Sequence, residues 1–401
     1  MSLLSDLVLC RRPAASFAQI GVFWGAFAAQ VPPLKAQAGL SDSGFGLVML
    51  VTAAGGVIAM SAAPWLDRKL GARALMVMSL ILTCVVLLPG LAQGWVFFML
   101  AMLLATMSVG SLDVLMNARV SQIEARVGHA LMNLNHAMFS FAYAGGALLA
   151  GLLREAGTTP LPIFALVAGI VLALVPLTRG AEPVSQSGIP AANSASSPSA
   201  DPASEFTTSP PMAPPMGLPW GIVLPIGMIV LIAFLSENAT EAWSALHLER
   251  NMGAGAATGA LGPAILGLTM GVGRLTGQIA SQRLPEAQVI WWASVMTALG
   301  AALAGWAQSL ALGYLGFGLL GLGVSVVAPL AFAWVGRMVR PDLRTLAISR
   351  VAAIGYSGFF IGPPVMGFLS DGFGLHISFS AIAALMMLVP LGLVPLLLRR
   401  T

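Results

Sequence analysis

One aspartate stands inside a segment that is otherwise almost entirely apolar, and polar residues accompany it at helical spacing. Steps of four, three and four residues connect Thr106, Gly110, Asp113 and Asn117, so these residues share one face of a helix. A carboxylate in a membrane interior costs roughly 2.5 to 3.5 kcal/mol even on lenient scales, and such residues are usually retained for ion or proton handling. We therefore expect Asp113 to carry a proton and Asn117 to tune it.

A second polar stripe lies in the next apolar segment. Steps of three, four and three residues connect Asn133, His136, Ser140 and Tyr143. At 1.5 Å per residue, Asp113 and His136 lie roughly 9 and 10 Å inside the same membrane face, so we expect them at matching depth, with His136 tuning the proton carrier. A lone histidine in an apolar helix is equally often a hydrogen bond between helices, and that interpretation stays open.

Two glutamates stand one helical turn apart later in the chain. Glu237 and Glu241 share a face, with Asn238 partly on it, although Glu241 also fits the solvated end of a helix. Two arginines, Arg274 and Arg350, lie roughly 9 to 14 Å inside the membrane face and keep their charge at any physiological pH. We expect both to act in gating, with Arg274 bracing helix ends, while binding an anionic substrate or countering an acid are the alternatives. The residues expected to contact a substrate are Trp24, Gln30, Asn133, Tyr143, Glu237, Asn238, Glu241 and Tyr356.

The elements that must position these side chains are apolar stretches of roughly twenty residues, the length that crosses a bilayer as a helix. They recur about twelve times, and segments 74–92, 161–177 and 380–398 contain no charge. Hydrophobic residues make up 58% of the 401 residues and charged residues 8%, where soluble domains have roughly 45–50% and about 25%. The mean hydropathy is +0.89. The sequence therefore predicts an all-α membrane protein with twelve transmembrane helices.

A polar insert rich in Pro, Ser and Ala divides these helices into two sets of six. It has too few bulky apolar residues to pack, which predicts a flexible cytoplasmic linker over residues 179–217, between six-helix bundles at 1–178 and 218–401. The segment 145–151 recurs as 361–367, with Gly146 matching Gly362 and Gly151 matching Gly367. Equivalent spans six helices apart predict a parallel repeat about an axis along the membrane normal.

The basic residues indicate the orientation. With a cytoplasmic N-terminus and twelve spans, the loops of the opposite face receive only Lys35, Arg154 and Arg250. Lys and Arg are retained on the cytoplasmic side, so we expect both termini in the cytoplasm and a multi-pass protein of the bacterial inner (plasma) membrane. We expect it to act as a monomer, because one chain supplies both halves.

Several other activities find no motif in this sequence. The formal charge of +4 is dispersed among loops without aromatic interleaving, which argues against nucleic acid as a partner. The sequence has no Walker-type phosphate loop, no His/Cys cluster with metal spacing and no nucleophile elbow. We expect no metal, no cofactor and no enzyme activity, and what remains is a secondary transporter.

The loop at 64–73 contains Asp67, Arg68 and Arg73 in the order and spacing of a known cytoplasmic gating motif, although the leading Gly is replaced at 62–64. With this motif, the chain resembles the major facilitator superfamily over nearly its whole length. The resemblance implies two pseudo-symmetric six-helix bundles around a central cavity. It also implies a charge-assisted clamp in which Asp67, Arg68 and Arg73 act at the cytoplasmic helix ends.

A narrower resemblance rests on the segments 110–118 and 131–140, which look like the fucose-permease-like branch of that superfamily, where an acid precedes an Asn by four residues. Members of that branch are commonly proton-coupled sugar symporters, but the branch's second carboxylate is missing from the first span here. The resemblance therefore implies a carboxylate-based mechanism more than it implies a sugar.

Together these features predict transport of a small polar solute by alternating access, coupled to an ion, which we expect to be H⁺, and running as symport. Proton-coupled efflux of a drug or metabolite is one alternative. A membrane sensor that transports nothing is the alternative from another class.

Overall fold

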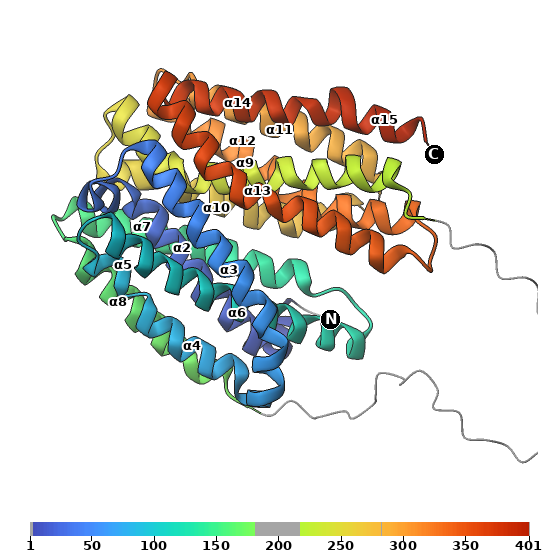
Figure 1. The fold of residues 1–401 in the computed structure, drawn as a ribbon, viewed down its shortest axis with the longest axis horizontal. Coiled ribbons are helices and arrows are strands. Elements are labelled where there is room, and N and C mark those ends of the chain that lie inside the picture. Colours follow the sequence, from blue (N-terminus) through green and yellow to red (C-terminus); the bar gives the residue numbers. More distant parts are fainter. Residues whose placement is uncertain (1–2, 181–216, 282, 401) are drawn as a thin grey trace, which may run out of the picture.

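The computed structural model describes residues 3–180, 217–281 and 283–400, and its regular elements are helices (Figure 1). The predicted linker, residues 179–217, falls almost wholly outside these residues. In the N-terminal half the helices are α1 (Leu3–Leu9), α2 (Arg11–Ala38), α3 (Asp42–Leu70), η1 (Gly71–Arg73), α4 (Ala74–Val85), α5 (Leu88–Leu91), α6 (Trp95–Val127), α7 (Met132–Glu155), α8 (Pro160–Leu174) and η2 (Val175–Thr178). In the C-terminal half they are α9 (Trp220–Met252), α10 (Ala256–Ser281), α11 (Glu286–Gly305), α12 (Leu310–Met338), α13 (Arg344–Phe373), α14 (Leu375–Leu388), η3 (Val389–Leu393) and α15 (Val394–Leu398).

The predicted twelve spans are confirmed. Within the described residues, eleven helical stretches are long and apolar enough to cross a membrane, and one of them, Asp42–Leu91, is 50 residues long. That stretch contains two spans, because Gly71 at a φ of 52° turns the chain through η1 between α3 and α4. The last span is made of α14, η3 and α15 in succession.

The spans form two bundles, one from each half of the chain (Figure 1). Both chain ends lie at the same end of the molecule, which we name the terminal end, and the opposite one is the distal end. The loop between α2 and α3 and the start of α6 lie at the distal end, and the turn η1 lies at the terminal end. The basic residues Lys35, Arg154 and Arg250 share the distal end, as the sequence predicted.

Matched glycines show the predicted repeat inside each bundle. A Cβ placed on Gly146 of α7 would lie 2.4 Å from the Val22 carbonyl oxygen of α2, and one on Gly362 of α13 would lie 3.3 Å from the Leu235 carbonyl oxygen of α9. The fifth span thus packs on the first as the eleventh packs on the seventh. Small residues let these helix backbones approach closely.

The second pair of matched glycines joins the two bundles. A Cβ on Gly151 of α7 would lie 2.2 Å from the Ala260 Cβ of α10, and one on Gly367 of α13 would lie 2.4 Å from the Asp42 carbonyl oxygen of α3. Helices α7 and α10 form one interface between the halves, and α3 and α13 form the other. The two interfaces are equivalent under the pseudo-two-fold axis, and together they enclose a space at the centre of the molecule.

Candidate functional site

A cavity of about 580 Å³ lies between the two bundles and is lined by both. Its polar lining comes from α3, α6 and α7 in the N-terminal half and from α9, α10 and α13 in the C-terminal half. Of the residues that the sequence singled out, it contains Trp24, Asp113, Asn117, His136, Glu237, Asn238, Glu241, Arg274 and Tyr356. The stripe that contains Asp113 therefore faces this space along its length, whereas His136 is the member of the second stripe that lines it.

Asp113 lies on α6 and is held by a neighbour on its own helix. The Asn117 side-chain nitrogen donates to an Asp113 carboxylate oxygen at 3.1 Å and to the Asp113 carbonyl oxygen at 2.9 Å. The remainder of this stripe has a packing role: the Thr106 hydroxyl donates to the Thr52 carbonyl at 2.7 Å, and Gly110 lets the Gly56 backbone approach. Asp113 thus faces the cavity next to a close contact between α3 and α6.

His136 lies on α7 and lines the same cavity as Asp113. Its ring packs edge-on against Phe17 of α2, with 4.9 Å between ring centroids. No hydrogen bond joins the His136 and Asp113 side chains in the part of the chain that the structure describes. The two residues are neighbours across a cavity, and an interaction between them would pass through it.

Arg274 connects the two halves at the level of this cavity. Its guanidinium pairs with Glu237 of α9 at 2.9 Å and donates to the Ser140 hydroxyl at 2.5 Å and to the His136 carbonyl at 3.3 Å, both on α7. Glu237 lies in the middle of α9, while His136 and Ser140 lie in the first half of α7. Arg274 thus contacts a neighbouring helix and the opposite bundle, whereas the sequence suggested that it braces helix ends. Both members of the pair are about nine-tenths buried, which makes their mutual neutralisation necessary.

Glu241 lies one turn from Glu237 and also lines the cavity. Among the described residues, no cation lies within ion-pairing distance of the Glu241 carboxylate, and no hydrogen bond to it is formed. The charges of Glu241 and Glu237 act on the hydroxyl of Tyr143, which is 1% exposed and has no hydrogen-bond partner among the described residues. A partly buried carboxylate and a buried hydroxyl are therefore left unsatisfied near one another.

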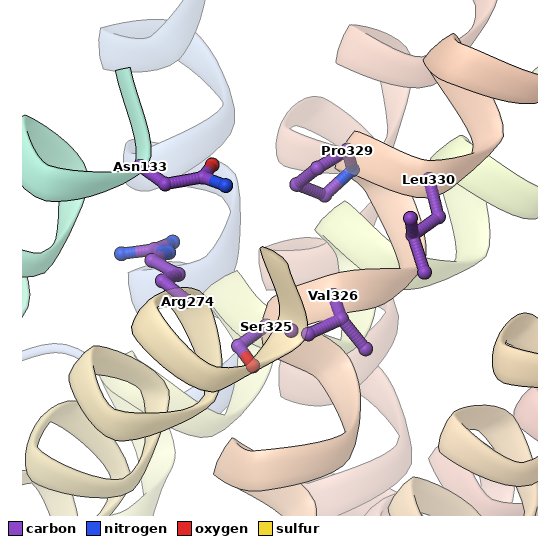
Figure 2. A pocket seen from close by; sticks show the side chains of 7 residues that line it. Asn133, Arg274, Ser325, Val326, Pro329 and Leu330 are labelled. Atoms are coloured by element: carbon purple, nitrogen blue, oxygen red, sulfur yellow. The ribbon is translucent and has the colours of Figure 1, made fainter. Parts of the chain in front are cut away.

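The other predicted site residues lie outside the main cavity. Gln30 is fully buried, and neither amide atom has a hydrogen-bond partner among the described residues. Arg350 is exposed on α13. Asn133 faces a smaller pocket of about 30 Å³, where Figure 2 shows it with Arg274 on one side and α12 residues, including Ser325, on the other.

Sequence reasoning missed an aromatic cluster on the C-terminal wall of the cavity. Phe234 of α9 stacks on Phe359 of α13, with 4.7 Å between ring centroids. The ring centroid of Tyr356 lies 5.4 Å from that of Phe234 and 6.0 Å from that of Phe359. The spacing of 356, 359, 360 and 363, which places one face of a helix in the cavity, is the signal that could have revealed this cluster.

At the terminal end, Asp67 pairs with Arg119 of α6 rather than with Arg68 or Arg73. One Arg119 nitrogen forms an ion pair with an Asp67 oxygen, and the other donates to the second Asp67 oxygen at 3.3 Å. Arg68 and Arg73 are exposed. The expected gating acid is thus bound inside the N-terminal bundle and does not cross to the other half.

The distal end has ion pairs that do cross between the halves. Charges at helix ends were the one sign of them in the sequence. Arg154 of α7 binds both Glu249 oxygens at 2.8 and 2.9 Å, and Arg250 binds both Asp42 oxygens at 2.5 and 2.9 Å. Lys35 and the Ser370 hydroxyl also contact the Asp42 carboxylate. We name the four residues Asp42, Arg154, Glu249 and Arg250 the distal lock.

A second contact strengthens this closure. The carboxylate of Asp371 accepts hydrogen bonds from the backbone N–H groups of Asp42 and Ser43, at 3.1 and 2.8 Å. These are the first residues of α3, where unpaired N–H groups and the helix dipole attract negative charge. The C-terminal half therefore caps a helix of the N-terminal half, and the bundles are joined at the distal end.

Comparison with known proteins agrees with this architecture. The family model described as Major Facilitator Superfamily matches residues 14–285 and 227–401. An uncharacterised MFS-type transporter of Yersinia pestis is 29% identical over 371 residues, covering 92% of this chain and 91% of that protein. Membrane protein MosC of Rhizobium meliloti is 24% identical over 362 residues, covering 88% and 82%.

A solved structure shares the fold at low sequence identity. The bacterial homologue of the human lysosomal transporter Spinster, in an inward-facing and occupied conformation, superposes with a TM-score of 0.73 at 14% identity, covering 100% of this chain and 98% of that one. The family match extends over both bundles. The chain is thus a multi-pass membrane transporter and not an enzyme, and it belongs to the Major Facilitator Superfamily.

Proposed function

We propose that this transporter moves a small polar solute together with a proton, and that Asp113 is the proton carrier. The observation that supports this proposal is the environment of Asp113: it lines the central cavity, and its hydrogen-bond donor is the neutral amide of Asn117 rather than a base. A carboxylate in a membrane protein without a cationic partner is least costly when a proton neutralises it. Asp113 can therefore change its charge as the cavity changes its exposure.

The asymmetry between the two ends supports transport by alternating access. The distal lock joins the bundles at one end, whereas at the other Asp67 with Arg119, and Arg340 with Asp342, pair within one bundle. We propose that the terminal end faces the cytoplasm of a bacterial cell. The loops at that end carry more Arg and Lys residues than the loops at the distal end, and such residues are retained on the cytoplasmic side. In that orientation the structure is an inward-facing state, and rocking of the halves would expose the cavity to the other side.

The test is uptake into proteoliposomes with and without an imposed pH gradient, screened over sugars, organic acids and amines. We expect at least one solute to accumulate only when the gradient is present. Asp113→Asn should abolish this accumulation and make the remaining solute exchange independent of pH. Asp342→Asn, which removes an exposed acid at the terminal end, serves as the control.

Two outcomes contradict this assignment. If the Asp113→Asn protein still accumulates solute in response to the pH gradient and the Glu237→Gln protein does not, the coupling site lies on α9. Accumulation driven by a Na⁺ gradient in the absence of a pH gradient would replace the proton by Na⁺. The resemblance to the fucose-permease-like branch predicts that sugars belong in the screen, and it stays a prediction.

A second candidate is proton-coupled efflux, and the aromatic cluster of Phe234, Tyr356 and Phe359 favours it. Stacked aromatic rings present apolar surface, against which a flat apolar molecule can be buried. Everted and right-side-out vesicles distinguish the two directions: efflux predicts proton-driven accumulation in everted vesicles, and symport predicts it in right-side-out ones.

A further inference from the structure

The charges that line the cavity do not balance. Asp113, Glu237 and Glu241 are three acids, and Arg274 is the one Arg or Lys among the cavity-lining residues that the structure describes. Arg274 forms an ion pair with Glu237 and donates hydrogen bonds to the Ser140 hydroxyl and the His136 carbonyl. Asp113 already has the role of proton carrier in the proposed function. Glu241 is left without an ion-pair partner.

Two buried polar atoms near Glu241 are also unsatisfied. The Tyr143 hydroxyl has no hydrogen-bond partner among the described residues, and neither does the side-chain oxygen of Asn238, which lines the cavity. Buried polar groups in proteins are normally hydrogen-bonded, so the unpaired oxygen of Asn238, which lines the cavity, indicates a missing ligand or water. The Asn238 oxygen and the Glu241 carboxylate both carry negative charge density, which suits a ligand with a positive charge.

The remainder of the lining is aromatic rather than polar. Trp24 and Phe139 line the N-terminal side, and the cluster of Phe234, Tyr356 and Phe359 lines the C-terminal side. Trp24 stands next to Gly25, whose α-carbon packs against the Tyr143 backbone, so Trp24 lies at the depth of Tyr143. Aromatic faces carry negative charge density and attract organic cations.

We propose that the solute is an organic cation, with a protonated or quaternary amine on an apolar or aromatic body, and that Glu241 is its counter-ion. This proposal rests on the proposed transport function and names its substrate class. An anion would need Arg274, which Glu237 already neutralises. An uncharged polyol would leave the Glu241 carboxylate uncompensated and would meet mostly apolar rings.

Glu241 and Asp113, the two cavity acids without an ion-pair partner among the described residues, lie at different distances from the distal end. They can therefore bind different ligands. At 1.5 Å per residue, Glu241 lies about 16 Å from the distal end of α9, and Asp113 lies about 27 Å from the distal end of α6. A separation of roughly 10 Å along the path lets a cation occupy Glu241 while a proton occupies Asp113. The inference is compatible with either direction of coupled transport.

Binding to the purified full-length protein in detergent tests the inference. The probes are tetraphenylphosphonium and tetraphenylborate, which have nearly the same shape and opposite charges, with benzyltrimethylammonium as a smaller competing cation. We expect tetraphenylphosphonium to bind by equilibrium dialysis, benzyltrimethylammonium to displace it and tetraphenylborate to fail. Glu241→Gln should weaken cation binding at least tenfold, whereas Asp342→Asn should leave it unchanged.

A graded substitution at Trp24 gives a second measurement that does not depend on Glu241. Cation affinity should fall in the order Trp24, Trp24→Phe and Trp24→Leu, while the thermal unfolding midpoint confirms that each variant is folded. Equal binding of borate and phosphonium, or full cation affinity in a folded Glu241→Gln protein, would overturn the inference.

The result also separates this inference from the transport proposal. Proton-driven uptake of an uncharged solute without any cation binding would refute the cation site and leave proton-coupled transport intact. Cation binding that depends on Glu241, in a protein that accumulates none of the screened solutes, would support the site and count against proton-coupled transport.

Discussion

Arg154 of the N-terminal half donates two hydrogen bonds to the Glu249 carboxylate of the C-terminal half, at 2.8 and 2.9 Å. Its Nη1 atom also donates to the Ala29 carbonyl at 2.6 Å. One guanidinium thereby fixes α7, α2 and α9 at the distal end. Arginine suits this position because its planar donors match a carboxylate at two points. The closed distal end depends on this geometry, and four predictions follow from it and from the other contacts of the site.

Removing Arg154 should favour a state that is open at the distal end. Because breaking a buried ion pair at one partner is costly, we expect Arg154→Ala to shift the population by about tenfold or more. Spin labels at Thr159→Cys and Asn251→Cys, in a protein lacking Cys10 and Cys84, report the distance between the halves. Arg340→Ala is the control, since its partner Asp342 lies in the same loop. An unchanged distance distribution in Arg154→Ala would show that the lock does not hold the halves.

The pair of Arg274 and Glu237 should matter for stability as well as for transport. Each single change, Arg274→Gln or Glu237→Gln, leaves a buried charge without its partner and should cost about 3 kcal/mol. The double variant should recover part of that loss, because neither charge remains. Thermal unfolding in detergent measures this cycle. Additive losses in the double variant would mean that the two side chains do not interact.

Asp67 should act through Arg119 and not through its sequence neighbour. Both Asp67→Ala and Arg119→Ala remove the same ion pair, so we expect both to slow transport severalfold with little change in substrate affinity. Arg68→Ala is the matched control, because Arg68 is exposed, and exposed ion pairs contribute about 0–1 kcal/mol. A slow Arg68→Ala protein beside a normal Arg119→Ala protein would assign the gating role to Arg68.

His136 allows packing to be separated from proton chemistry. His136→Phe keeps an aromatic ring against Phe17, whereas His136→Ala removes it. If the imidazole tunes the proton carrier, both variants should shift the pH optimum of transport, and we expect this result. Loss of function in His136→Ala with a normal pH profile in His136→Phe would reduce His136 to a packing residue.

Much of the fold could be predicted from the sequence, because its information is local. Apolar stretches long enough to span a bilayer give the helices, and the recurring glycines give the repeat. The Asp113–Asn117 hydrogen bond joins positions four apart on one helix, so spacing alone predicts it. The contacts of Arg274 with Glu237 and Ser140 join three helices, and no spacing within one helix reveals them.

One misplacement could have been avoided from the sequence. Gln30 lies six residues beyond Trp24 on α2, which at roughly 100° per residue places it about 120° around the helix from the side where Trp24 faces the cavity. Its burial outside the cavity agrees with that rotation. The distal lock is different, since its members lie up to 208 residues apart in the chain and meet only when the bundles close.

The composition of the distal lock has an electrical consequence. Each half contributes one acid and one base to it: Arg154 and Asp42 from the N-terminal half, Glu249 and Arg250 from the C-terminal half. When the halves separate, these two pairs leave no net charge on either side, so their opening moves no net charge through the membrane field. The distal lock therefore contributes no net gating charge, and the solute, the proton and the acids that hold them in the cavity are the charges expected to sense the voltage.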